Sequence, residues 1–136
     1  MNILVIDAQG GGIGKQLVTV IKQNIPEADV TAVGTNSTAT TAMLKAGADH
    51  AATGENAVIV GCRKADVIVG PIGIIIADAM YGEVTPKMAQ AVAASDARRV
   101  LIPFQHCDTI IVGVSDLGMN RLVQDAVNEI ATGRNE

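Results

Sequence analysis

The chain begins Met1-Asn-Ile-Leu-Val-Ile-Asp-Ala-Gln-Gly-Gly-Gly-Ile-Gly-Lys15, and this stretch decides the fold. Residues 3–6 are a continuous apolar run, which is typical of a strand buried on both faces of a sheet. Four glycines follow within five positions, and an amphipathic pattern begins at Lys15. A strand, a glycine turn and a helix in this order predict the start of a βαβ unit, which offers a place for a phosphate.

The glycine turn is the predicted ligand site. Because Gly10, Gly11 and Gly12 carry no Cβ, an anion can approach their backbone N–H groups at the positive end of the following helix. Gly14 falls in the first helical turn, where a side chain would push the helix and the strand apart. The alternative is a turn whose glycines serve only tight packing.

The turn matches no complete nucleotide-binding fingerprint. A dinucleotide-binding G-x-G-x-x-G needs glycine where Lys15 stands, and a P-loop needs glycine in place of Gln9 and a hydroxyl in place of Gln16. Residues 12–14 look like the glycine turn of short-chain dehydrogenases. Residues 11–15 look like the variant P-loop of the partitioning ATPases, without the threonine that would hold magnesium.

Composition predicts a single domain over residues 1–136, with a core of its own. The longest apolar run, residues 67–77, has 11 residues and contains glycine and proline, against the roughly 20 that a membrane span needs. It therefore indicates core or a subunit interface, and no membrane partner is expected. A net charge of −4 without a basic stripe argues against nucleic acid. The two cysteines and the lack of a secretory signal favour the cytoplasm.

Strands and helices are expected to alternate along the chain, which predicts a parallel, doubly wound sheet. The expected strands span residues 3–6, 29–34, 49–53, 66–70, 98–104 and 109–114. The expected helices span residues 12–25, 39–46, 53–64, 74–80, 86–94 and 117–132, with Asp116 capping the last of them.

The fold class that follows is a Rossmann-like, three-layer α/β/α domain with strand order 3-2-1-4-5 and an antiparallel sixth strand at the edge. The connection 105–108 is too short for a right-handed crossover, and this makes the sixth strand antiparallel. Ligand is expected outside the carboxyl ends of strands 1 and 4, where the strand order reverses. Residues 7–12, 35–36, 70–73 and 105–108 would surround that crevice.

Two charged residues at the turn have several possible roles. Lys15 either neutralises a phosphate or is a solvated surface lysine. Asp7 would repel a phosphate unless it binds a ribose hydroxyl, a metal ion, Lys15 or the N–H groups of the glycine turn. The candidate cofactor-binding residues are Asp7, Gly10, Gly11, Gly12, Ile13, Gly14, Lys15, Thr35, Asn36, Gly70, Pro71 and Gly73.

The sequence has no acidic residue at the position where dinucleotide-binding folds carry the acid that binds the ribose. In dinucleotide-binding folds an acid about 20 residues past the glycines holds the ribose 2′-hydroxyl. Residues 34–37 stand there, Gly-Thr-Asn-Ser, and none is acidic. Their neutral groups would tolerate a 2′-phosphate, but no arginine is present to hold one. This weakens the case for NAD and leaves NADP open.

Nothing in the sequence identifies a catalytic residue or a metal site. His106, Cys107 and Asp108 are adjacent, but neighbours in a turn seldom point at one another, and catalytic triads are assembled in space. No spacing of cysteine and histidine resembles a zinc site. His50 is expected on the ordinary surface.

The whole chain resembles a small family of uncharacterised bacterial proteins with an NAD(P)-binding, Rossmann-like fold. The resemblance implies a nucleotide-binding type of fold. It brings no established activity and supplies no catalytic residue. It is carried by residues 5–15, 34–36, 42–48, 53–57, 70–74 and 82–86.

The leading hypothesis is a protein that binds a phosphate-bearing nucleotide, with NAD(P) as first candidate, at the glycine turn. One alternative is a non-enzymatic, ligand-responsive sensor or partner subunit, and a third is a P-loop-like nucleotide hydrolase. A homo-oligomer, as a dimer, is also expected, because one short segment is more apolar than its own domain usually buries. Its apolar residues are Ile72, Ile74, Ile75, Ile76, Met80 and Tyr81.

Overall fold

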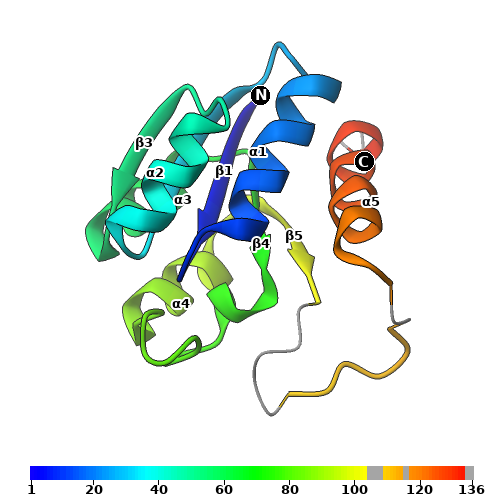
Figure 1. The fold of residues 1–136 in the computed structure, drawn as a ribbon. Helices are drawn as coiled ribbons and strands as arrows, with labels where there is room; N and C mark the ends of the chain where they lie inside the picture. The colour runs from blue at the N-terminus through cyan, green and yellow to red at the C-terminus, as the bar shows by residue number, and fades with distance from the viewer. Residues whose placement is uncertain (104–108, 115–116, 134–136) are drawn as a thin grey trace.

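A computed structural model describes residues 1–103, 109–114 and 117–133 of the chain (Figure 1). The strands are β1 (Asn2–Asp7), β2 (Asp29–Gly34), β3 (His50–Thr53), β4 (Val67–Pro71) and β5 (Arg98–Ile102). The helices are α1 (Gly12–Asn24), α2 (Ser37–Lys45), α3 (Glu55–Lys64), α4 (Pro86–Ala94), α5 (Met119–Thr132) and the 3₁₀ helix η1 (Ile72–Ile75).

The five strands form one parallel sheet in the order β3-β2-β1-β4-β5, which confirms the order predicted for them. The first strand is central, and its residues 3–6 are at most 2% exposed. Because successive side chains of a strand point to opposite faces, Ile3 and Val5 pack into one hydrophobic cluster, and Leu4 and Ile6 pack into the other.

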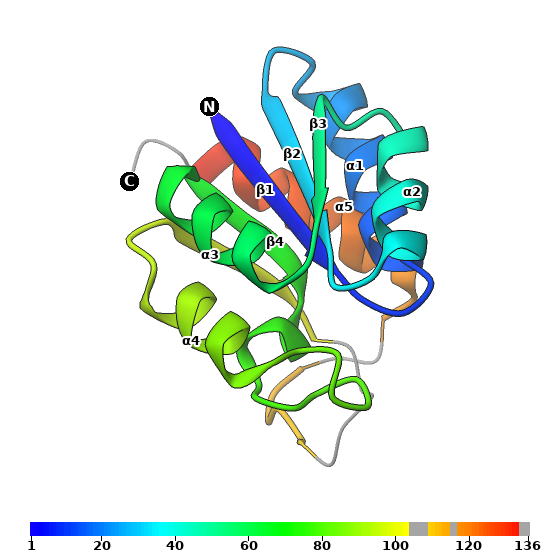
Figure 2. The same ribbon diagram turned by 90° about the vertical axis from the view of Figure 1, so that its left-hand side faces the viewer.

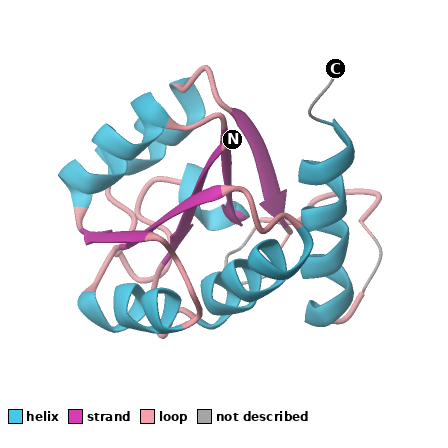
Figure 3. Ribbon diagram, turned by 90° about the horizontal axis from the view of Figure 1, so that it is seen from above, coloured by secondary structure: helices cyan, strands magenta, loops and turns pink. Residues whose placement is uncertain are grey.

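Helices cover both faces of the sheet and give the predicted three layers (Figures 2 and 3). On one face α1 packs between α2 and α5, and on the other α3 packs beside α4. The first cluster joins Leu17 of α1 to Val127 of α5, and the second joins Val58 of α3 to Val92 of α4. The single Rossmann-like α/β fold is therefore confirmed.

Two helices begin at side-chain caps. The side chain of Asn36 accepts a hydrogen bond from the amide of Ala39 and caps α2. Thr85 accepts from the amide of Met88 and caps α4, with Pro86 at the first helical position. Both arrangements satisfy amides that a helix start leaves without partners.

Two predicted elements are wrong. Residues 109–114 form no strand; a turn interrupts them, with Gly113 at φ 88°. Residues 74–80 form no α-helix, because the chain leaves η1 for a loop in which Asp78 and Met80 have positive φ. The predicted cap Asp116 and the connection 105–108 lie outside the described residues, and the N-cap of α5 is Gly118.

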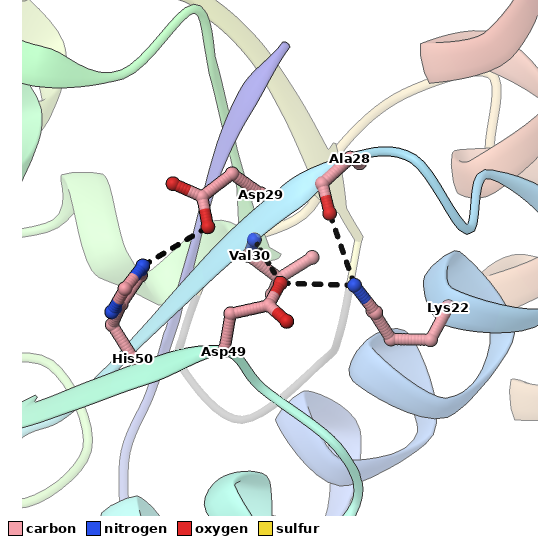
Figure 4. Close-up of polar contacts among 6 residues, drawn as sticks. All are labelled: Lys22, Ala28, Asp29, Val30, Asp49 and His50. Atoms are coloured by element: carbon pink, nitrogen blue, oxygen red, sulfur yellow. Dashed lines mark hydrogen bonds and ion pairs between the residues drawn. The ribbon is translucent and has the colours of Figure 1, made fainter.

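The amino ends of β2 and β3 are held by Asp49 (Figure 4). Its Oδ2 accepts hydrogen bonds from the amide of Val30 at 2.8 Å and from Nζ of Lys22 at 2.9 Å. These two bonds, the first more strongly, lower the pKa of Asp49. His50 Nε2 lies 3.0 Å from Asp29 Oδ1, and both side chains are more than half exposed. His50 is thus a surface residue, at the end of the sheet opposite the glycine turn.

None of the helices in the described part of the chain is both long and apolar enough to cross a membrane.

Candidate functional site

The glycines of the turn have different roles. The amide of Gly11 donates to the carbonyl of Ala8 at 3.0 Å, and Gly11 has φ 74°. A Cβ on Gly11 would lie 2.8 Å from Cα of Ala39 in α2, so the fold itself requires glycine there. A Cβ on Gly10 or Gly12 would meet nothing within 4 Å. Packing therefore explains why Gly11 is a glycine, whereas Gly10 and Gly12 border open space.

Gly14 brings α1 close to its neighbours. A Cβ at this position would lie 2.5 Å from Sδ of Met43 and 2.9 Å from Cβ of Asp7. The prediction that a side chain here would separate the helix from the strand is confirmed.

Asp7 ends β1 beneath the turn and is only 4% exposed. Its Oδ1 accepts from the amide of Ala8 at 2.8 Å, and its Oδ2 accepts from the amide of Gly14 at 2.7 Å. Of the alternatives for this carboxylate, binding the N–H groups of the turn is the one observed. Burial raises the pKa of Asp7, the hydrogen bonds oppose this, and the charge of Glu83 adds to it.

Glu83 brings a second carboxylate to the same edge of the sheet. It comes from the loop before α4, and its Oε1 accepts from the amide of Gln9 at 2.9 Å, from Oγ1 of Thr35 at 2.7 Å and from Nδ2 of Asn36 at 2.7 Å. Partial burial acts to raise the pKa of Glu83, but the hydrogen bonds outweigh it and lower the pKa below 4.5. The acid that the sequence lacks after β2 is therefore supplied from elsewhere in the chain.

Sequence reasoning missed Glu83. Its partners Gln9 and Asn36 lie 74 and 47 positions away along the chain. The residue falls within the stretch 82–86 that carries part of the family resemblance, but no nucleotide-binding motif or periodicity marks it, because it belongs neither to the glycine turn nor to a strand end. A second local signal is its place two residues before the capping Thr85.

A small pocket of about 180 Å³ opens at the turn. Within the part of the chain that the structure describes, the amides of Gly10 and Gly12 have no hydrogen-bond partner. Unpaired amides at a helix start attract negatively charged groups. The pocket is lined by Asp7, Ala8, Gln9, Gly10, Gly11, Gly12, Ile13, Pro71 and Met80.

The structure brings together most of the predicted site residues. Thr35 and Asn36 join the turn through Glu83, and Nδ2 of Asn36 also donates to the carbonyl of Gln9 at 3.0 Å. Three of the predicted glycines do not line the pocket: Gly14, described above, Gly70 and Gly73. A Cβ on Gly70 would collide with the carbonyl of Ile6, and one on Gly73 would collide with Met80. These two glycines allow close packing.

Lys15 lies apart from the glycine pocket. It lines a separate hollow of about 600 Å³ beside α2. Lys45 and three hydroxyl-bearing residues of that helix line the same hollow. A lysine that reaches back over the turn, as in a P-loop, is not observed.

Outside the glycine turn, the described residues contain a larger cavity and a buried thiol. A cavity of about 420 Å³ is lined by residues of β1, β2, β3 and α3; most of them are aliphatic, and the polar ones are Asn2, Asp29, Thr31, His50 and Lys64. Burial raises the pKa of the Cys62 thiol to about 11, which keeps it protonated. The described residues include no group of three metal-ligating side chains. The adjacent residues 106–108 lie outside the described part of the chain.

Comparisons with known proteins complete the description of the site. No curated protein matches the chain. One similar solved structure is a dodecameric FMN-dependent UbiX-like decarboxylase from Escherichia coli O157:H7, with a TM-score of 0.48 and 17% identity over 96% of this chain and 76% of that one. Another is AibC, with a TM-score of 0.47 and 19% identity over 98% of this chain and 42% of that one. A family model described as a domain of unknown function, DUF3842, matches residues 2–135, and the chain therefore belongs to that family.

Proposed function

We propose that this protein binds a phosphate-bearing nucleotide in the cytoplasm, with NAD(P) as the first candidate, at the carboxyl ends of β1 and β2. The observation that carries the proposal is that the amides of Gly10 and Gly12, which line the pocket before α1, have no hydrogen-bond partner in the described part of the chain. A phosphate there would accept their N–H groups and lie at the positive end of the helix.

The pocket limits what part of the ligand it can hold. Its 180 Å³ lies below the roughly 300 Å³ at which pockets for whole small-molecule ligands begin. It suits a phosphate group, and the rest of the nucleotide would extend over the end of β2 toward Thr35, Asn36 and Glu83.

Charge narrows the class of ligand further. Asp7 and Glu83 place two carboxyl groups at the turn, and none of the described residues that line the pocket is a lysine or an arginine. Repulsion grows with ligand charge, so the phosphates of a dinucleotide, which carry one charge each, suit the site better than a triphosphate. This disfavours the nucleotide hydrolase, as do the position of Lys15 and the absence of a hydroxyl at Gln16.

A non-enzymatic sensor or partner subunit would bind its ligand at this same site. This alternative differs from the leading hypothesis in predicting that the ligand is bound and released unchanged. Assay of the bound nucleotide after prolonged incubation separates the two.

Thermal unfolding against a panel of NAD, NADP, ATP, ADP, FMN and inorganic phosphate tests the proposal. A ligand at 100 times its dissociation constant stabilises the native state by about 2.7 kcal/mol. The blocking variant is Gly12→Asp, because Gly12 has open space for a side chain and starts α1, where an acid suits the helix dipole. We expect a shift with a dinucleotide in the wild type and none in the variant.

Gly118→Asp is the matched control. Gly118 also stands at a helix start with open space, and the substitution adds the same charge far along the chain. The ligand shift should survive in this variant. The proposal is wrong if no nucleotide shifts the wild type, or if Gly12→Asp keeps the full shift.

A further inference from the structure

We infer that Glu83 makes the site selective for a nucleotide with a free ribose 2′-hydroxyl, that is, for NAD over NADP. The inference rests on the proposed function and names the form of ligand that the same site takes.

The hydrogen bonds of Glu83 leave half of its carboxylate available. All three donors, from Gln9, Thr35 and Asn36, meet Oε1. Oε2 has no hydrogen-bond partner among the described residues, and it is not sealed from solvent, because no buried side-chain oxygen or nitrogen in the described structure lacks a partner. A carboxylate oxygen only accepts hydrogen bonds, so Oε2 takes a donor such as a sugar hydroxyl.

The position of this carboxylate fits the ribose. In dinucleotide-binding folds the acid that holds the 2′-hydroxyl stands after the second strand. Here Thr35 and Asn36 occupy that place, and their side chains hold Glu83 there instead. A third hydrogen bond, from the amide of Gln9, ties Glu83 to the residue before the pocket glycines, so the proposed phosphate and ribose subsites adjoin.

A 2′-phosphate would be rejected at this position. Its negative charge would face Glu83, and among the described residues no lysine or arginine donates a hydrogen bond to that carboxylate. Like charges at contact distance repel, and desolvation in a crevice strengthens the repulsion.

The backbone around Glu83 is fixed by hydrogen bonds and by burial of the next residue. Its own amide donates to the carbonyl of Met80, and the next residue, Val84, is 1% exposed and paired with Asp78 and Ala79 through backbone hydrogen bonds. Thr85 then caps α4. A carboxylate fixed before ligand arrives contributes to affinity because little ordering is needed on binding.

Titration calorimetry with NAD and NADP tests the inference on the wild type, Glu83→Gln and Glu55→Gln. Glutamine keeps an acceptor for the three donors and removes the charge. We expect the wild type to bind NAD at least about tenfold more tightly than NADP, since hydrogen bonds to a charged group carry this much discrimination. The preference should fall about tenfold in Glu83→Gln.

Glu55→Gln is the matched control. Glu55 starts α3 at the same edge of the sheet and accepts a hydrogen bond from Thr85 Oγ1 at 2.6 Å, and it does not line the pocket. Its substitution should leave the NAD preference unchanged.

Salt provides a second test that needs no variant. Because the rejection of NADP is electrostatic, the preference of the wild type should shrink as ionic strength rises from about 0.01 M to 1 M. Equal binding of NAD and NADP by the wild type, or a preference that neither salt nor Glu83→Gln reduces, overturns the inference while nucleotide binding stands. Failure of the wild type to bind either dinucleotide overturns both.

Discussion

Oδ2 of Asp7 lies 2.7 Å from the backbone nitrogen of Gly14, so the last residue of β1 holds the first turn of α1. The other carboxylate oxygen accepts the amide of Ala8. An acid of the chain therefore satisfies part of the helix start that a bound anion would otherwise satisfy. Among the described residues, the amides of Gly10 and Gly12 have no partner and are available to a ligand.

Replacement of Asp7 by asparagine should lower stability. An amide offers one acceptor and presents its NH₂ group to the other buried N–H, which then loses its partner. The expected loss in the free energy of unfolding is about 1–3 kcal/mol, measured by urea denaturation.

Asp96→Asn is the control for this experiment, because Asp96 is exposed. A surface change of this kind usually stays within about 0.5 kcal/mol. Equal stability of Asp7→Asn and Asp96→Asn would show that the carboxylate does not hold the helix start.

The hydrogen bonds of Glu83 should make the free energy of unfolding depend on pH in the acidic range. The pKa of Glu83 is lower in the folded state than the value of 4.5 that applies to the unfolded chain. Between these two pKa values the unfolded state therefore binds more protons than the native state. Stability from ionised Glu83 is thus complete above pH 4.5 and is lost as pH falls through the lowered folded-state pKa. The stability difference between wild type and Glu83→Gln should be constant near neutrality and shrink below pH 4.5, as denaturation at several pH values would reveal. A difference that grows in acid would contradict this account.

The glycines of the turn should respond differently to alanine. Gly11→Ala places a side chain in a left-handed conformation and against the backbone of Ala39, so it should cost at least about 1–2 kcal/mol. Gly12→Ala meets open space in a helical position and should be neutral or stabilise by about 0.4–1 kcal/mol. Chemical denaturation of both variants measures the contrast. Equal losses would mean that both glycines serve packing.

The fold could be predicted well from the sequence because its signals are local. A buried apolar strand, a glycine turn and alternating helices indicate the order of the five strands. Asn36 and Thr85 are residue types that favour the start of a helix, and each caps one. The segment 109–114 has strand-forming residues, yet pairing requires a partner edge, which no local pattern reports. The apolar run before Met80 resembles a helix but leaves η1 for a loop of positive-φ residues.

The candidate site was predictable only in part. The turn and the ends of β1 and β2 come together because parallel strands place their carboxyl ends at one edge. The contribution of Glu83 depends on how a distant loop folds back onto that edge, and composition and spacing carry no information about this. The sequence leaves several roles open for Asp7, and the structure shows its carboxylate bound to the amides of Ala8 and Gly14.

Self-association remains a prediction, with a different basis. Ile74 is buried in the core of its own chain, and Ile75, Ile76 and Met80 pack against that core. Tyr81 of the predicted segment is 99% exposed, and apolar side chains are also exposed in the segment 109–114, where Ile110 is 83% and Val112 is 94% exposed. Exposed apolar stretches of this kind favour burial against a second copy.

Light scattering at micromolar concentration should therefore give about twice the chain mass of 14.0 kDa. Replacement of both Ile110 and Val112 by serine should give the single-chain mass without loss of the folded spectrum. A monomeric wild type would refute the prediction.

The central claim is that a nucleotide binds at the glycine turn, and the amide signals of the glycines report on it most directly. We would record ¹H–¹⁵N correlation spectra of the protein during titration with NAD. The account predicts the largest shifts at Gly10 and Gly12, with Gly118 and the cavity-lining Gly61 unchanged. Shifts centred on Gly61, or none at Gly10 and Gly12 with NAD at millimolar concentration, would contradict it.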